Sequence, residues 1–178
     1  MPPKRFQGTT SDDTAVRMSE LVLPNDANPL GNLLGGKVMH LMDVAAAIAA
    51  TRHARRPVVT VSVDGIEFRH PVKVGHVVHL EARVNHAGTT SMEVGVEVES
   101  ENPLTGERLH TSSAYLTFVA LDDHGRPVAV PPLRVTTAAE RKRFTEAAAR
   151  RAARLRRFHV KSAEVAAAQL ASRKRGRS

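Results

Sequence analysis

A chain of 178 residues is long enough for one domain with extensions, and it can bury a core of ordinary size. It contains no cysteine, which excludes disulfides, thiolate zinc sites and a cysteine nucleophile, and which favours a cytoplasmic location. The formal net charge of +8 belongs to the end of the chain, because residues 1–133 carry 12 Lys and Arg against 15 Asp and Glu, whereas residues 134–178 carry 14 against 3.

The first segments are polar and weakly patterned. Residues 1–13 contain no apolar core of a signal peptide, and we expect a flexible N-terminus. Residues 14–23 alternate, with Val16 and Met18 on one side, and predict a strand that ends at Pro24. A loop rich in turn-forming residues follows, and Gly35 and Gly36 are expected to supply backbone freedom where the chain reverses before a helix.

Residues 37–53 predict one long helix that is apolar nearly all round and therefore buried on most faces. Its longest uncharged apolar run, residues 44–50, is too short to span a bilayer. Asp43 interrupts this helix. A buried carboxylate loses hydration and must find partners or hold its proton more tightly, which suits a general base. Asp43 lies too far from the helix start to act as a cap or to interact with the helix dipole.

The periodicity changes from helical to two after Pro57 and stays so to about Asp122. Strands are predicted near residues 59–64, 78–85, 92–99 and 109–121, with turns at residues 71–75 and 102–106. The strand at 92–99 alternates valines with glutamates, which predicts one buried and one wet face. The last strand is apolar on both sides in its second half, as expected for a central or interface strand.

The final segment has a different composition. Residues 126–133 are predicted to form a proline-rich linker. Thr136 and Thr137 are then expected to cap a helix that reaches about Leu170. Alanine and arginine dominate this helix, so we expect a solvated helix with a disordered end at residues 172–178. Five of its cations fall at helical spacings and could instead hold acidic neighbours, nucleic acid or an anionic surface: Arg150, Arg151, Arg154, Arg157 and Lys161.

One antiparallel sheet wrapped around one alanine-rich helix resembles the hotdog fold, an α+β architecture. The motifs in the chain resemble more closely those of the acyl-CoA thioesterase (acyl-CoA hydrolase) family of hotdog proteins. They are Asp26-Ala27-Asn28, Gly35-Gly36, Met42-Asp43, Arg52-His53, Ser62-Val63-Asp64, the turn from Phe68 to Gly75, Ser91-Met92-Glu93-Val94 and the turn from Asn102 to Glu107. The resemblance covers about residues 14–133, expected as a hotdog thioesterase domain, and leaves residues 134–178 as a basic helical tail.

The resemblance implies a catalytic carboxylate at Asp43 and a catalytic asparagine at Asn28. In the family these two side chains come from different hotdog units, so a homodimer is expected, and a trimer of such dimers. Gly36, at the helix start, would present a free backbone N–H to the thioester oxygen. Whether Asp43 acts as base or nucleophile stays open.

Substrate binding is expected of five further residues: Gly35, Asp64, Ser91, Arg52 and Arg55. Arg52 and Arg55 could equally offset the helix dipole, and Asp64 and His53 could be structural in the same way. The implied activity is hydrolysis of fatty acyl-CoA to fatty acid and coenzyme A, with no cofactor beyond the coenzyme A of the substrate.

Other kinds of site are weaker. The nine histidines include no helical pair beside a carboxylate, so no metal site is predicted. Ser62 and Ser91 lack the flanking glycines of a serine hydrolase elbow. Two alternatives stay open: a non-catalytic acyl-CoA-binding regulatory module that uses the basic tail on nucleic acid, and a dehydratase, which would need a histidine beside the carboxylate. Nucleic acid is disfavoured because the enrichment of the tail in alanine and arginine can also reflect compositional bias.

Overall fold

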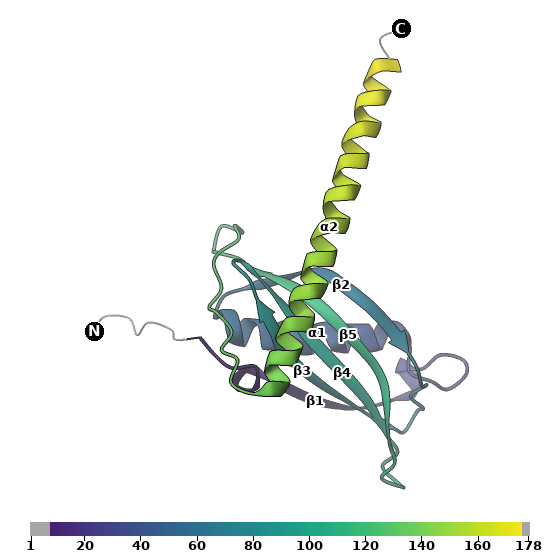
Figure 1. The fold of residues 1–178 in the computed structure, drawn as a ribbon. Coiled ribbons are helices and arrows are strands. Elements are labelled where there is room, and N and C mark those ends of the chain that lie inside the picture. Colours follow the sequence, from purple (N-terminus) through teal and green to yellow (C-terminus); the bar gives the residue numbers. More distant parts are fainter. Residues whose placement is uncertain (1–7, 176–178) are drawn as a thin grey trace.

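The computed structural model describes the backbone of residues 8–175 and the side chains of residues 8–158. A five-stranded antiparallel sheet, in the order β1-β3-β4-β5-β2, curves around one helix, α1, while a second helix, α2, crosses its other face (Figure 1). The elements are η1 Asp12–Thr14, β1 Val16–Leu21, η2 Pro24–Asp26, α1 Gly35–Ala54, β2 Val58–Phe68, β3 Val77–Ala87, β4 Ser91–Glu101, β5 Arg108–Ala120 and α2 Ala138–Arg175.

The strand pattern of the sequence is confirmed, because the alternating apolar residues of β4 and its neighbours face α1. Val94 of β4 lies between Val84 of β3 and Leu116 of β5, and all three side chains are buried in one core. β5 is a central strand between β4 and β2, as its apolar second half predicted. The α+β hotdog architecture that the sequence predicted is therefore present.

One face of α1 packs on this sheet and the other is open. Ala45, Ala46, Ala49 and Ala50 are fully buried, since alanine lets the strands approach the helix closely. Met39 and Ile48, on the rest of the surface of α1, are exposed. The prediction that α1 is buried on most faces is thus wrong for a single chain, because five strands cover only one side of it.

The diglycine does not reverse the chain. Gly35 and Gly36 form the first turn of α1 without a positive φ, whereas Gly31, with φ of 75°, makes the turn that precedes it. The predicted role of the diglycine in backbone reversal is therefore wrong. The turn at residues 102–106 is confirmed, with Gly106 at φ of 75° and its N–H donating to the Asn102 carbonyl over 2.8 Å.

The basic tail is not a solvated helix over its first half. α2 lies on the outer face of the sheet, opposite α1 (Figure 1). Its Ala147 is fully buried. Glu93, on the β4 face that was predicted to be wet, is only 2% exposed beneath α2. Glu97 of the same face is exposed, as predicted. Glu93 and the first half of α2 differ from the prediction for one reason: acids of the sheet and cations of the helix cover each other there. The backbone of α2 is helical to Arg175, whereas residues 176–178 lie outside the described residues.

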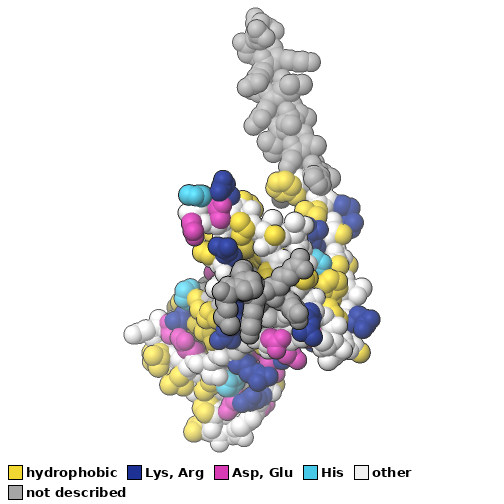
Figure 2. Space-filling view, turned by 90° about the vertical axis from the view of Figure 1, so that its left-hand side faces the viewer, with side chains coloured by type: hydrophobic (Ala, Val, Ile, Leu, Met, Phe, Trp, Pro, Cys, Tyr) yellow, Lys and Arg dark blue, Asp and Glu magenta, His cyan; other side chains and the backbone are white. Residues whose placement is uncertain are grey.

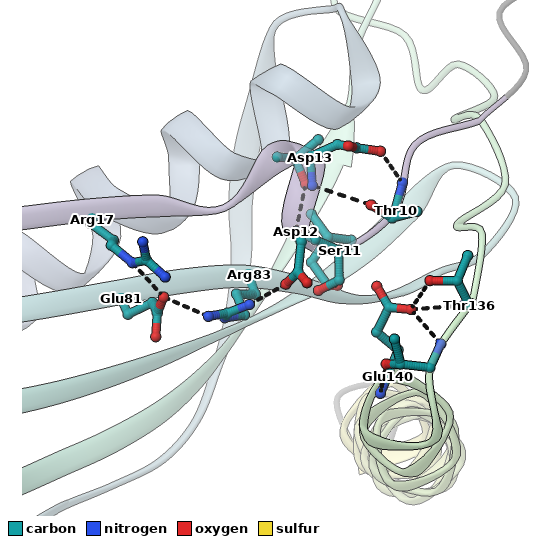
Figure 3. Close-up of polar contacts among 12 residues, drawn as sticks. Thr10, Ser11, Asp12, Asp13, Arg17, Glu81, Arg83, Thr136 and Glu140 are labelled. Carbon is teal, nitrogen blue, oxygen red and sulfur yellow. Dashed lines mark hydrogen bonds and ion pairs between the residues drawn. The ribbon is translucent and has the colours of Figure 1, made fainter.

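The start of the chain is tied to the same face. Asp12 accepts a hydrogen bond from Arg83, which also pairs with Glu81, and Glu81 accepts from Arg17 of β1 over 2.8 Å (Figure 3). Ser11 Oγ donates to the Val84 carbonyl over 2.8 Å. Residues 9–13 are therefore anchored rather than flexible, while residues 1–7 of the predicted flexible segment lie outside the described residues.

The predicted cap of α2 is present. The Glu140 carboxylate accepts a hydrogen bond from the Thr136 N–H over 2.7 Å (Figure 3). It also accepts from the Thr137 N–H over 3.0 Å, and Thr137 Oγ1 accepts from the Glu140 N–H. This reciprocal arrangement is a capping box, and it fixes where α2 begins. Val130 of the preceding segment is buried, so the proline-rich linker is packed against the domain.

Surface charges are mixed on the body. On the face in Figure 2, basic and acidic side chains lie next to one another and among hydrophobic ones, with no broad field of one sign. In the part of the chain that the structure describes, no helix is long and apolar enough to cross a membrane.

Candidate active site

Asp43 lies on the open side of α1, next to β2. Its side chain is half-buried, and its Oδ1 accepts a hydrogen bond of 2.7 Å from Thr60 Oγ1 of β2. The expectation of a carboxylate deep in a buried helix is therefore corrected: Asp43 has a hydroxyl partner and reaches the surface of the single chain. A carboxylate in this position can still accept a proton from water or attack a carbonyl carbon.

Thr60 is the residue near Asp43 that sequence reasoning missed. It belongs to β2, where its Cα partner is Phe118, and a register irregularity separates it from Ser62. The irregularity shifts the strand pattern by one residue, so Thr60 reaches the α1 side. The sequence placed Thr60 only as a polar residue alternating with valines, and a bulge is not visible in such a pattern.

The start of α1 presents two unused backbone donors. Neither Gly35 N–H nor Gly36 N–H donates to any acceptor among the described residues. Gly36 is exposed, and a Cβ built on it would meet nothing within 4 Å, so a ligand atom could approach its N–H closely. The first N–H groups of a helix carry the positive end of its dipole, which suits a developing negative oxygen.

Asn28 lies in the loop before α1 and is held by its own turn. Its Oδ1 accepts from the Leu30 N–H over 2.9 Å and from the Asn32 N–H over 3.2 Å. These bonds occupy the amide oxygen and identify it as the acceptor. The side-chain NH₂ has no acceptor among the described residues, so Asn28 can offer a donor to a ligand.

A pocket of about 340 Å³ joins Asn28 to the helix start. Gly35, Leu33, Val38 and Phe68 contribute to its lining, so it combines an apolar wall with the amide of Asn28. A Cβ on Gly35 would stand 3.5 Å from the Phe68 ring, in ordinary contact. Asp43 does not line this pocket. It lies eight residues beyond Gly35, about 12 Å along the helix axis.

The structure does not bring the other predicted substrate-binding residues to this pocket. Arg52 Nη1 donates to the Ala15 carbonyl over 2.8 Å, and Arg55 ends α1 in the left-handed region with its N–H on the Thr51 carbonyl. Ser91 begins β4, paired with Val119. Arg52 lies in the last turn of α1 and Arg55 is its C-cap residue, which is where the helix-terminus interpretation needs them.

Asp64 faces away from α1. Its carboxylate pairs with Arg154 of α2 and lies 3.7 Å from Arg157 Nη2. Beside it, Arg150 forks onto Glu93 with hydrogen bonds of 2.7 and 3.1 Å. Burial raises the pKa of Glu93, and the Arg150 guanidinium offsets part of that rise. Asp64 is thus engaged in an ion-pair cluster on the outer face rather than in the pocket.

His53 is a fully buried structural histidine. Thr9 Oγ1 lies 2.8 Å from its Nδ1, and the Pro131 carbonyl lies 2.9 Å from its Nε2. Burial lowers its pKa from the ordinary value of 6.5, while the Pro131 carbonyl acts in the opposite direction. The side chain therefore joins the N-terminal segment and the linker to the end of α1.

Residues 30–107 match the family described as the thioesterase superfamily. The chain is 44% identical over 119 residues, which are 67% of this chain and 69% of the relative, to Bacillus subtilis YkhA, named an uncharacterized acyl-CoA thioester hydrolase. A solved apo-hexameric acyl-CoA thioesterase has a TM-score of 0.81 and 41% identity, covering 85% of this chain and 97% of that one.

A second solved relative is the acyl-CoA hydrolase of Staphylococcus aureus in complex with butyryl coenzyme A, coenzyme A and coenzyme A disulfide. Its TM-score is 0.79 at 33% identity, covering 88% of this chain and 94% of that one. The same enzyme has been solved as the variants Asp43Ala, Thr60Ala and Asn28Ala. This chain carries the same residue type at each of these three numbers.

Proposed function

Since this chain belongs to the acyl-CoA thioester hydrolases of the thioesterase superfamily, we propose that it hydrolyses fatty acyl-CoA at a site made from Asp43, Asn28 and Gly36. The observation that carries the proposal is the carboxylate of Asp43, held by Thr60 on the open side of α1, together with unused donors at the helix start. The three substituted positions of the S. aureus enzyme add support, because their residue types and numbers recur here.

The oxyanion of the reaction would form at the helix start. Attack on the thioester carbon turns the carbonyl oxygen negative, and the Gly36 N–H with the Asn28 NH₂ offers two donors to it. Gly35 is kept as a substrate-binding residue because it lines the adjoining pocket. The apolar wall of Leu33, Val38 and Phe68 would receive the part of the acyl group nearest the thioester.

Asp43 would act on the other side of the thioester. As a base it removes a proton from water while the water oxygen bonds to the carbonyl carbon; as a nucleophile it forms an anhydride that water then cleaves. In both routes the C–S bond breaks and coenzyme A leaves as a thiolate, which takes up a proton. Thiolate is a good leaving group, so no strong general acid is required.

The site is proposed to be completed by a second copy of the chain. Within one chain Asp43 is about 12 Å from the diglycine along α1, which is too far for both to contact one thioester. Val63 of β2 is exposed and pairs with Leu116, whose side chain is in the core beside α1, so it adds apolar surface next to the open side of α1. A homodimer that covers this surface would bring Asp43 of one protomer to Asn28 and Gly36 of the other, and the hexameric relative fits a trimer of such dimers.

The non-catalytic alternative is not favoured. The relatives are named hydrolases, and the cations that would have contacted nucleic acid, Arg150, Arg154 and Arg157, are paired with acids of the chain's own sheet. The dehydratase alternative needs a histidine at the carboxylate, whereas the partner of Asp43 is Thr60. A cytoplasmic location and the absence of any cofactor besides the coenzyme A of the substrate stay predictions.

Thiol release tests the proposal directly. The purified protein is supplied with acyl-CoAs from acetyl to stearoyl, and Asp43→Asn is compared with Asp123→Asn, which alters an exposed carboxylate that has no described partner. We expect Asp43→Asn to lower the rate by at least about 100-fold, since removing an acid–base group typically costs that much, and Asp123→Asn to leave it unchanged. Near wild-type turnover in Asp43→Asn would contradict the assigned role, and the panel gives the acyl-length preference.

A further inference from the structure

α2 contacts one strand of the sheet after another. The Phe144 ring packs on His86 of β3 with centroids 4.7 Å apart. Arg150 forks onto Glu93 of β4 and lies 3.5 Å over the Tyr115 ring of β5. Arg154 then pairs with Asp64 of β2. Because Ala147, Arg150 and Arg154 share one side of the helix by their spacing, α2 is a strap that runs from β3 to the edge strand β2.

The contact with β2 is shielded from water. The Asp64 and Arg154 side chains are 19% and 17% exposed, so their ion pair is less screened than one on an open surface. Arg154 Nη1 also lies 4.0 Å from Glu93, and Arg157 lies 3.7 Å from Asp64. Removing one member of such a cluster leaves the other poorly compensated, which is costly.

Within one chain, β2 has fewer backbone restraints than the central strands. It pairs only with β5 among the described strands, and its pairing is irregular between Thr60 and Ser62 and again between Asp64 and Glu67. Asp64 therefore ends a short regular segment, residues 62–64, whose backbone pairs with one neighbouring strand of the chain. The side-chain bonds to α2 add a second restraint on the same segment.

Thr60 lies four residues before Asp64 on this strand and donates to Asp43. We propose that Arg154 and Asp64 are positioning residues for hydrolysis: through them α2 fixes β2, and β2 holds Thr60 against the Asp43 carboxylate. This inference rests on the proposed function for its effect on turnover, but not for the coupling of α2 to β2. The basic charge of the first half of α2 then serves the active site of its own chain.

The test uses the full-length protein with Asp64→Asn and Arg154→Gln. Arg156→Gln is the matched control, since Arg156 lies on the same helix, is exposed and has no described partner. Amide hydrogen exchange over residues 58–64 measures how strongly α2 restrains β2, and thiol release measures the effect on hydrolysis. We expect faster exchange there and an approximately tenfold lower kcat with KM changed less than twofold in both variants, and no change in Arg156→Gln.

Two further variants distinguish a positioning role of Asp64 and Arg154 in hydrolysis from a role in stability alone. If Asp64 acts through Thr60, then adding Asp64→Asn to Thr60→Val will not lower kcat further, and Arg154→Lys will restore part of the rate lost in Arg154→Gln. Unchanged exchange in residues 58–64, or full kcat in variants that lose only thermal stability, would overturn the inference. The two proposals can also fail separately. If the wild-type protein releases no thiol but amide exchange in β2 still depends on Arg154, the proposed function is refuted, whereas the coupling of α2 to β2 is supported.

Discussion

At the scale of single residues, His53 shows how a buried titratable group makes folding depend on pH. Its two ring nitrogens face the Thr9 hydroxyl and the Pro131 carbonyl, which suits a neutral ring with its proton on Nε2. Protonation would place a charge in a fully buried site whose Nδ1 already has a hydroxyl to accept from. The native state therefore binds this proton less readily than the unfolded chain does.

The stability of the protein should fall as pH drops below about 6.5, the ordinary value. Above that pH the contribution of His53 is fully present, and it is lost as pH falls toward the lowered native pKa, with a slope of at most about 1.4 kcal/mol per unit. Urea unfolding at pH 7.5 and 5.5 should show a smaller loss in His53→Gln than in wild type. The stability of the variant still depends on pH, because burial also lowers the pKa of His86. Burial raises the pKa of Glu93, so in both proteins Glu93 contributes more stability as the pH falls. An equal loss in wild type and variant would contradict the assignment.

At the scale of elements, α2 belongs to the folded domain rather than to a detachable tail. Its capping box, the burial of Ala147 and the Glu93–Arg150 pair link its first half to the sheet. The sequence-based interpretation of residues 134–178 as a separate solvated tail therefore needs revision, and we expect their removal to affect the domain. Contacts of α2 with the sheet reach at least Arg157, and the side chains beyond Phe158 lie outside the described residues.

Two truncations distinguish these parts. A chain that ends at Val135 should lose α2 and expose the outer face, lowering Tm by several degrees, because about 1 kcal/mol corresponds to 2–4 °C in a domain of this size. Its rate should also fall by about tenfold, since β2 loses its strap. A chain that ends at Phe158 should keep wild-type rate and Tm. Calorimetry and thiol release measure both, and full activity in the shorter chain would refute the revision.

At the scale of the whole molecule, a single chain leaves an apolar surface open. Val61 is 55% exposed and Phe68 50% on the edge strand β2, and Met39 is 46% exposed on α1. Large exposed apolar groups along an unpaired strand edge commonly mark an interface. A second copy that covered them would also remove water from Asp43, whose half-burial in one chain reflects that open side.

Mixing two inactive variants tests this assembly. Neither Asn28→Ala nor Asp43→Ala has an intact site as a homodimer if the two side chains meet across the interface. A mixed dimer regains one site of two, so co-expression in equal amounts should restore about a quarter of wild-type activity by random pairing of two-fold symmetric protomers. Mass spectrometry verifies that mixed dimers form. No recovery in their presence would show that each chain builds its own site.

Much of the fold could be predicted from the sequence, because it is set by local patterns. The change from a helical period to a period of two at Pro57 gave α1 followed by strands, and the Val–Glu alternation of β4 gave its two faces. Thr136 and Thr137 likewise marked the start of α2, since a cap involves residues that are close in sequence. Asp43 stood out for the same reason, as one charge in an apolar helix.

What the sequence alone determined is therefore the elements, their apolar faces and the polar residues that interrupt them. The tertiary structure decided which of these residues meet: Arg154 and Asp64 are 90 positions apart, and Arg150 and Glu93 are 57 apart. The bulge that turns Thr60 toward Asp43 was equally invisible, because it depends on the pairing of β2 with β5. A local pattern says that a side chain needs a partner, whereas only the packing of distant elements brings the two charges within a few ångströms of each other.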